Sequence, residues 1–88
     1  MSLTNLYQLE DARRKRTHLR KIAAVSENVK ELREINHHVG DAIISLTKYD
    51  RYSSVKRILE DLFVLHQDIR RAIVNKEEVL ERLENEKE

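Results

Sequence analysis

The feature that most constrains this chain is a heptad seam, a row of mostly apolar residues spaced alternately three and four positions apart. The row consists of Ile22, Val25, Val29, Leu32, Asn36, Val39, Ile43 and Leu46. This spacing places all of its members on one face of an α-helix. The seam passes Gly40 without a change of phase, so we predict a single helix over residues 19–48. The alternative is a break at Gly40 with Asp41 as a new N-cap, which would interrupt the register.

A second seam follows the only cluster of turn-forming residues, which lies between Thr47 and Ser54. It predicts a turn at residues 49–53 and a second helix over residues 54–87. Its members are Val55, Ile58, Leu62, Leu65, Ile69, Ala72, Lys76, Val79 and Leu83. A flanking row widens this apolar stripe with Leu59, His66, Ile73 and Leu80. Stripes this wide suit a bundle of several helices better than a strict two-stranded coil.

The composition agrees with an all-α fold, because the 88 residues include one Gly and no Pro and 38% of them are charged. Such a chain has little material for strands and hairpin turns. Two long helices joined by a short turn pack antiparallel, so we predict a single domain that is an antiparallel helical hairpin. With the turn centred near Asp50 and Arg51, residue i should lie opposite roughly residue 101 − i.

Residues 1–18 depart from this pattern, because the first seam meets only polar residues when it is extended backwards. We predict a separate N-terminal segment, formed either as a short extra helix or as an extension of the first helix. Its apolar residues, Leu3, Leu6 and Tyr7, should face a different surface from the seam.

The second helix carries more apolar surface than one neighbouring helix can cover. Its four consecutive apolar residues, which point to all sides of the helix, are Leu62, Phe63, Val64 and Leu65. Exposed apolar patches of this kind mark interfaces. We therefore predict that two hairpins form a homodimeric four-helix bundle, or that a helical protein partner covers the patch. A three-helix monomer, with the N-terminal segment covering Phe63, is the alternative.

Two polar residues within the stripes, Asn36 and His66, are predicted to set register and specificity. One Asn in a helical seam can fix register and partner number at some cost in stability. The hairpin register places Asn36 opposite Leu65 and close to His66. A solvated position at the edge of the stripe is the alternative for Asn36.

A basic run within residues 11–21 has two interpretations. Its cationic residues are Arg13, Arg14, Lys15, Arg16, Arg20 and Lys21. In the predicted hairpin they lie beside the acidic residues 80–88, so the first interpretation is a charge pairing within the chain. The second is contact with nucleic-acid phosphates. The run lacks aromatic residues for base stacking, and its only apolar residues, Ala12 and Leu19, are too few for binding a membrane surface.

No motif in the sequence predicts catalysis. The chain has no Cys for a thiolate ligand or nucleophile, and its single Gly excludes a phosphate-binding loop of the glycine-rich type. His37 and His38 are adjacent, whereas two helical ligands of one metal ion are usually four residues apart. We therefore predict a protein that is not an enzyme and that has no metal, cofactor or small-molecule substrate.

The sequence thus predicts a helical module for protein–protein interaction or oligomerisation, such as an assembly factor, adaptor, small chaperone or regulatory subunit. A small dimeric nucleic-acid-binding regulator is the alternative. The N-terminus lacks the apolar region of a secretory signal, and no apolar run is long enough to span a membrane. We therefore expect a cytoplasmic protein.

Overall fold

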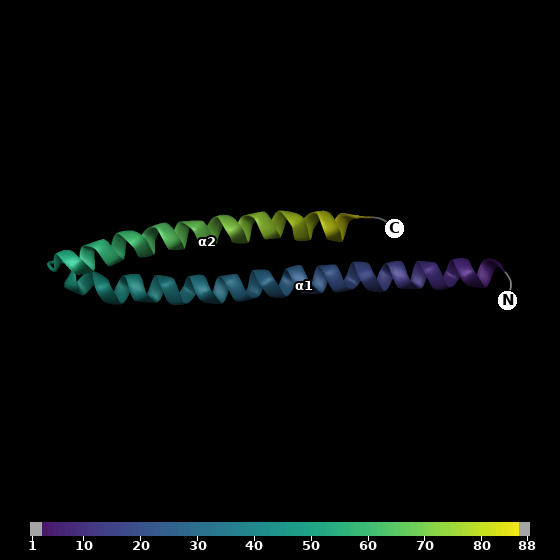
Figure 1. Cartoon of the computed structure of the whole chain (residues 1–88), viewed down its shortest axis with the longest axis horizontal. Helices are drawn as coiled ribbons and strands as arrows, with labels where there is room; N and C mark the ends of the chain where they lie inside the picture. Colours follow the sequence, from purple (N-terminus) through teal and green to yellow (C-terminus); the bar gives the residue numbers. More distant parts are fainter. Residues whose placement is uncertain (1–2, 87–88) are drawn as a thin grey trace.

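The structure, a computed structural model, describes the backbone of residues 3–86 and the side chains of residues 8–86. The chain forms two long helices, α1 (Leu3–Leu46) and α2 (Ser53–Asn85), which pack side by side in opposite directions (Figure 1). A short 3₁₀ helix, η1 (Thr47–Tyr49), begins the reversal between them. The predicted antiparallel helical hairpin is therefore confirmed. The helix predicted over residues 19–48 is instead part of a longer α1, which runs unbroken through Gly40.

The chain reverses direction over residues 47–52, and local hydrogen bonds close the turn. The Thr47 hydroxyl donates to the Ile44 carbonyl over 2.6 Å, and the Tyr52 amide donates to the Tyr49 carbonyl over 3.1 Å. The backbone of Tyr52 is extended, and α2 begins at the next residue, Ser53. The guanidinium of Arg51 lies 4.6 Å from the centre of the Tyr52 ring, a cation–π contact on the exposed end of the hairpin.

The seam predicted for α1 is the face that packs against α2. Each of its eight members is buried or half-buried, with Val29 and Ile43 among the most buried. Val29 packs with Ile69 and Ile73 of α2 at the centre of the core, and Leu32 and Val39 flank this cluster. The spacing of apolar residues in α1 was therefore sufficient to identify its buried face.

The seam predicted for α2 is correct at every second member and wrong at three of the four members between them. Five members lie in the contact with α1 as predicted and are buried or half-buried: Val55, Leu62, Ile69, Lys76 and Leu83. The intervening members Ile58 and Leu65 are 47% and 45% exposed, whereas Leu59 and Ile73 of the predicted flanking row are buried. His66 and Leu80, from the same flanking row, are half-buried. The stripe of α2 is wider than the contact with one helix, so only one of its two edges can face α1. The edge that faces α1 buries Leu59 and Ile73, whereas Ile58 and Val79 of the other edge stay exposed.

The helices also pair in a different register from the one predicted. Gly40 lies beside His66. A Cβ atom added at Gly40 would be 3.8 Å from the His66 Nε2 atom. The predicted register placed Ile35 there. The position of His66 beside Gly40, together with the contact between His18 and Glu86, places the centre of the pairing near Tyr52 rather than near Asp50.

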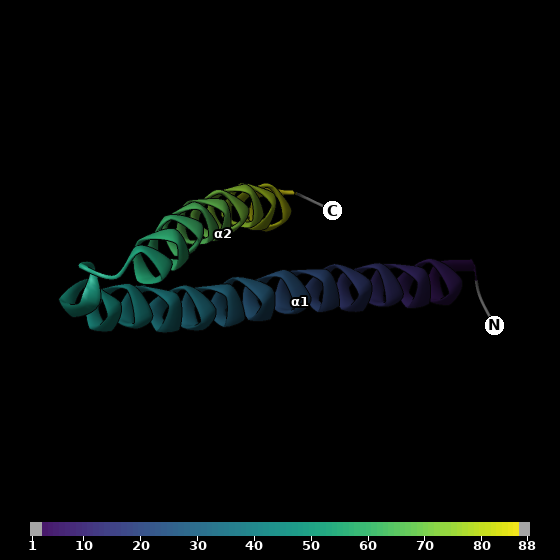
Figure 2. The same cartoon turned by 60° about the vertical axis from the view of Figure 1, so that its left-hand side comes forward.

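The first part of α1 extends beyond the end of α2 (Figures 1 and 2). Glu86, just after α2, lies 3.7 Å from the His18 ring, so residues 3–17 run past the last described residue of the C-terminal segment. We call residues 3–17 the overhang; at 1.5 Å per residue its length is about 22 Å. The helix has no break at residue 18, so the described part of residues 1–18 forms the predicted extension of the first helix rather than a short extra helix. The overhang leads away from Phe63, which excludes the three-helix monomer.

Candidate interaction surfaces

The patch predicted on α2 is divided by the packing of the hairpin. Phe63 and Val64 are 53% and 61% exposed on the outer side of α2, and Leu65 is also exposed. Leu62 is half-buried in the contact with α1. The side chains of Leu3, Leu6 and Tyr7, the other predicted interface residues, lie outside the described part of the structure. Phe63, Val64 and Leu65 therefore remain the exposed members of the predicted interface.

A second apolar surface was missed because the sequence prediction placed its residues inside the hairpin. Ile58, Leu65 and Val79 lie on one face of α2, with a spacing of seven residues between the first two and of fourteen between the last two, and all three are exposed. From α1, Ile35 is also exposed, and it lines a shallow depression that includes Lys76 of α2. Knowledge of which edge of the α2 stripe faces α1 was needed to recognise this surface.

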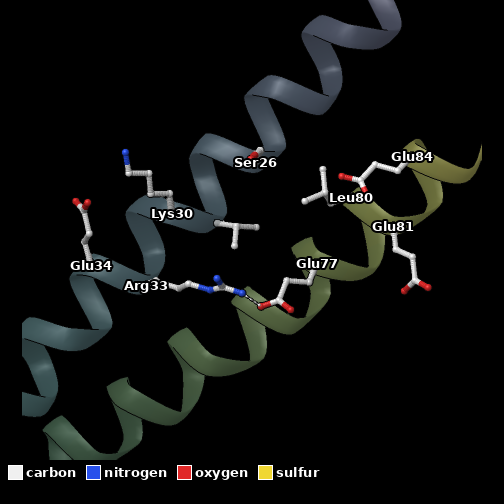
Figure 3. Close-up of a pocket in the computed structure, with 9 residues that line it drawn as sticks. Ser26, Lys30, Arg33, Glu34, Glu77, Leu80, Glu81 and Glu84 are labelled. Carbon is white, nitrogen blue, oxygen red and sulfur yellow. Dashed lines mark hydrogen bonds and ion pairs between the residues drawn. The ribbon is translucent and has the colours of Figure 1, made fainter.

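On another side of the hairpin, α1 and α2 enclose a groove of about 510 Å³ (Figure 3). Val29 and Leu80 contribute its apolar surface, and Arg33 donates a hydrogen bond of 2.8 Å to Glu77 across it. The charged residues that line it are Lys30, Arg33, Glu34, Glu77, Glu81 and Glu84. Four carboxylates face two cations, so the groove has an excess of negative charge. We call it the acidic groove.

The basic run lies partly on the overhang and partly at the end of the hairpin. Arg13, Arg14, Lys15 and Arg16 are exposed on the overhang, and Arg20 and Lys21 are exposed where α1 begins to run beside α2. The pairing predicted with residues 80–88 can form only at the C-terminal end of the run, because His18 rather than Lys15 lies beside Glu86. The His18 Nδ1 atom lies 3.7 Å from the Glu86 carboxylate, while residues 13–16 lie beyond the end of α2.

Asn36 and His66, the two residues predicted to set register, lie at different positions along the hairpin. Asn36 is half-buried on the α1 seam, and its Oδ1 atom is buried without a hydrogen-bond partner among the described residues. His66 is half-buried beside Gly40, one helical turn further along α1. An unpaired buried amide oxygen lowers stability. Such a cost is expected of a residue that selects register, which stays a prediction for Asn36.

The exposed histidines of α1 do not gather a metal site. His37 lies 3.4 Å from the Asp41 carboxylate, and Glu34 precedes it with the Glu-x-x-His spacing of ligands in helical bundles. These side chains point outward from a single helix, with His37 and Asp41 both exposed. Residues 3–86 contain no group of three or more His, Asp or Glu side chains placed to hold one metal ion.

Comparison of the chain with known protein families, with curated protein sequences and with solved structures found no significant match. Within residues 3–86, no helix contains an apolar stretch long enough to cross a lipid bilayer. The surfaces of the hairpin are therefore the basis for inferring its function.

Proposed function

We propose that this protein is a non-enzymatic helical module for protein–protein interaction and oligomerisation. The observation that carries this proposal is the amount of apolar surface that the hairpin leaves exposed. Among the described side chains, five hydrophobic residues are buried, and twelve large hydrophobic residues are exposed. Exposed apolar residues gathered on continuous surfaces are characteristic of sites that bind another protein.

The total surface area supports the same proposal. The chain exposes 7427 Å², whereas a compact monomer of 10.5 kDa exposes about 5,400 Å². The difference, about 2,000 Å² on one chain, is more than the roughly 800 Å² that each partner contributes to a standard protein–protein interface. The shape is equally extended, at 76 × 15 × 14 Å with a radius of gyration of 21.2 Å, against about 12 Å for a compact domain of this length. A partner helix lying along the hairpin would remove this excess surface from water.

The apolar residues on the outer side of α2 are the best placed to bind such a partner. Phe63 and Val64 project from consecutive positions, and Leu65 links them to the row that contains Ile58. An amphipathic helix that packs on this surface would gain affinity from apolar burial, while the flanking charges would select its orientation.

The experiment is sedimentation equilibrium of the full chain over a wide range of concentration, at low and at high salt. We expect the wild type to self-associate and the Phe63→Glu variant to associate more weakly, because a carboxylate replaces an exposed aromatic ring. Gln67→Glu is the matched control, since it adds the same charge on the same side of α2 without removing an apolar group. A wild type that stays monomeric throughout and binds no helical protein would overturn the proposal.

A nucleic-acid-binding regulator is the second candidate, and the exposed position of Arg13–Arg16 on the overhang favours it. Contacts between these cations and phosphates would release counterions, so affinity would fall steeply with salt. Binding of single- and double-stranded DNA should then weaken when Arg13, Arg14 and Arg16 are changed to Gln. DNA binding that is absent at low salt, or unchanged in that variant, would exclude this candidate.

A further inference from the structure

Two rows of side chains, one on α1 and one on α2, carry complementary groups in the same order. The row on α1 is Leu9, Arg13, Arg16 and Arg20, and the row on α2 is Val74, Glu77, Glu81 and Glu84. Both rows are spaced alternately by three and four residues, so each lies on one face of its helix. Each begins with an exposed apolar residue and continues with three charged residues, basic in α1 and acidic in α2. We call them the basic row and the acidic row.

The two rows cannot pair within one chain. Because α1 and α2 are antiparallel, their residue orders run in opposite directions along the hairpin. In addition, Leu9, Arg13 and Arg16 lie on the overhang, past the end of α2 (Figure 2). The rows can match along their length only where α1 of one molecule lies parallel to α2 of another.

We propose that the overhang of one copy of this chain docks in the acidic groove of a second copy, and that the second copy does the same in return. This inference rests on the proposed function, because it takes the partner to be a second copy of the chain. The contact it names is the acidic groove, in addition to the apolar surface around Phe63. Placing Arg13 beside Glu77 of the second copy also places Arg16 beside Glu81 and Arg20 beside Glu84. Leu9 then meets Val74, so apolar and charged groups are matched at every step.

The position of the groove on the hairpin is consistent with this symmetric contact. The basic row continues at the same alternating spacing through Ala23 and Glu27 to Lys30 and Glu34, which line the groove on its α1 side. The acidic row supplies Glu77, Glu81 and Glu84 on its α2 side (Figure 3). The basic row and the groove therefore open on the same side of the hairpin. Two copies related by a two-fold axis can each place an overhang in the other's groove, which gives a closed dimer.

The docking also gives the overhang a packing partner and brings positive charge to the acidic groove. In the isolated hairpin the overhang has no packing partner, so only its own backbone hydrogen bonds and its continuity with the packed part of α1 keep it helical. In the groove it would lie against both helices of the second copy, as the third helix of a local bundle. The excess of carboxylates there favours a basic helix and disfavours an acidic one, so the charges select the overhang as the occupant.

The test uses two full-length variants with reversed charges. The first, R13E/R16E/R20E, makes the basic row acidic, and the second, E77K/E81K/E84K, makes the acidic row basic. Each should dimerise at least about tenfold more weakly than the wild type in sedimentation equilibrium at low salt, because like charges then meet in both grooves. An equimolar mixture should restore dimers, since each variant's overhang matches the other variant's groove.

Circular dichroism establishes that each variant keeps its helices, and K48E/K56E/R57E is the matched control. This control changes the net charge by the same amount as R13E/R16E/R20E, near the turn and away from both rows. The proposal is overturned if either variant dimerises as the wild type does, or if the mixture remains monomeric. Dimers that resist both charge reversals but dissociate in Phe63→Glu would overturn the docking and leave the proposed function standing. A monomeric wild type whose basic run binds DNA would overturn both.

Discussion

Gly40 lies in the interior of α1 without any backbone conformation that requires glycine. The described residues include no glycine with a positive φ, and a Cβ atom at this position would make an ordinary contact of 3.8 Å with His66. Glycine within a helix is less stable than alanine by about 0.5–1 kcal/mol. We expect Gly40→Ala to raise the free energy of unfolding by about that amount, as measured by urea denaturation. A loss of stability would mean that His66 packs more closely against α1 than the structure shows.

Asn36 should lower the stability of the hairpin, because its Oδ1 atom is buried and unpaired among the described residues. Leucine at this seam position would remove the unpaired group and add apolar contact with α2. We expect Asn36→Leu to raise the free energy of unfolding by roughly 1–2 kcal/mol. Asn28→Leu is the control, since Asn28 is exposed on the same helix and its replacement relieves no buried polar atom. If both variants have the stability of the wild type, the Asn36 amide is satisfied in solution.

At the scale of the helices, adjacent residues of α2 distinguish the observed packing from the one that its sequence pattern predicted. Leu59 is 7% exposed in the contact with α1, whereas Ile58 is 47% exposed. We expect Leu59→Ala to lower the free energy of unfolding by about 2–3 kcal/mol and Ile58→Ala by less than about 1 kcal/mol. Denaturation at low protein concentration keeps association from contributing to the comparison. The reverse order of effects would support the original heptad assignment.

The helical pattern predicted the hairpin and the buried face of α1, because one narrow seam runs without interruption from Ile22 to Leu46. It did not fix the buried face of α2, since Leu65 and His66 both belong to a stripe wider than one helix can cover. The register depended on where the turn closes, which residue spacing does not specify. The error in register placed residues 13–17 beside the acidic C-terminus and therefore made the overhang shorter than it is.

The sequence did contain a signal for the acidic groove, namely the matching order of the basic and acidic rows. Leu9 is followed by three arginines at helical spacing, and Val74 by three glutamates at helical spacing. Recognising the rows as partners required two further facts, that α1 extends past α2 and that the groove and the basic row open on one side. Both are properties of the assembled hairpin, and neither follows from the pattern of a single helix.

At the scale of the whole molecule, the structure is a hairpin with one helix longer than the other, so the stability of its parts should be unequal. Residues 22–46 of α1 pack against α2, whereas the overhang gains packing contacts only in the proposed dimer. Local opening costs little free energy where few apolar contacts hold a helix. Amide hydrogen exchange, which reports the stability of individual segments, can therefore separate the hairpin from the overhang.

We expect the backbone amides of residues 3–17 to be protected from exchange in the wild type at concentrations where it is dimeric. In R13E/R16E/R20E, which should be monomeric, their protection should fall by at least about tenfold, because the overhang then has no packing partner and only its own backbone hydrogen bonds and its continuity with the packed part of α1 keep it helical. Residues 22–46 should keep most of their protection, and K48E/K56E/R57E should behave as the wild type does. An overhang protected equally in both variants would be a helix that is stable on its own. An overhang unprotected in the wild-type dimer would show that the dimer forms through another surface, with the apolar row of Ile58, Leu65 and Val79 as the next to test.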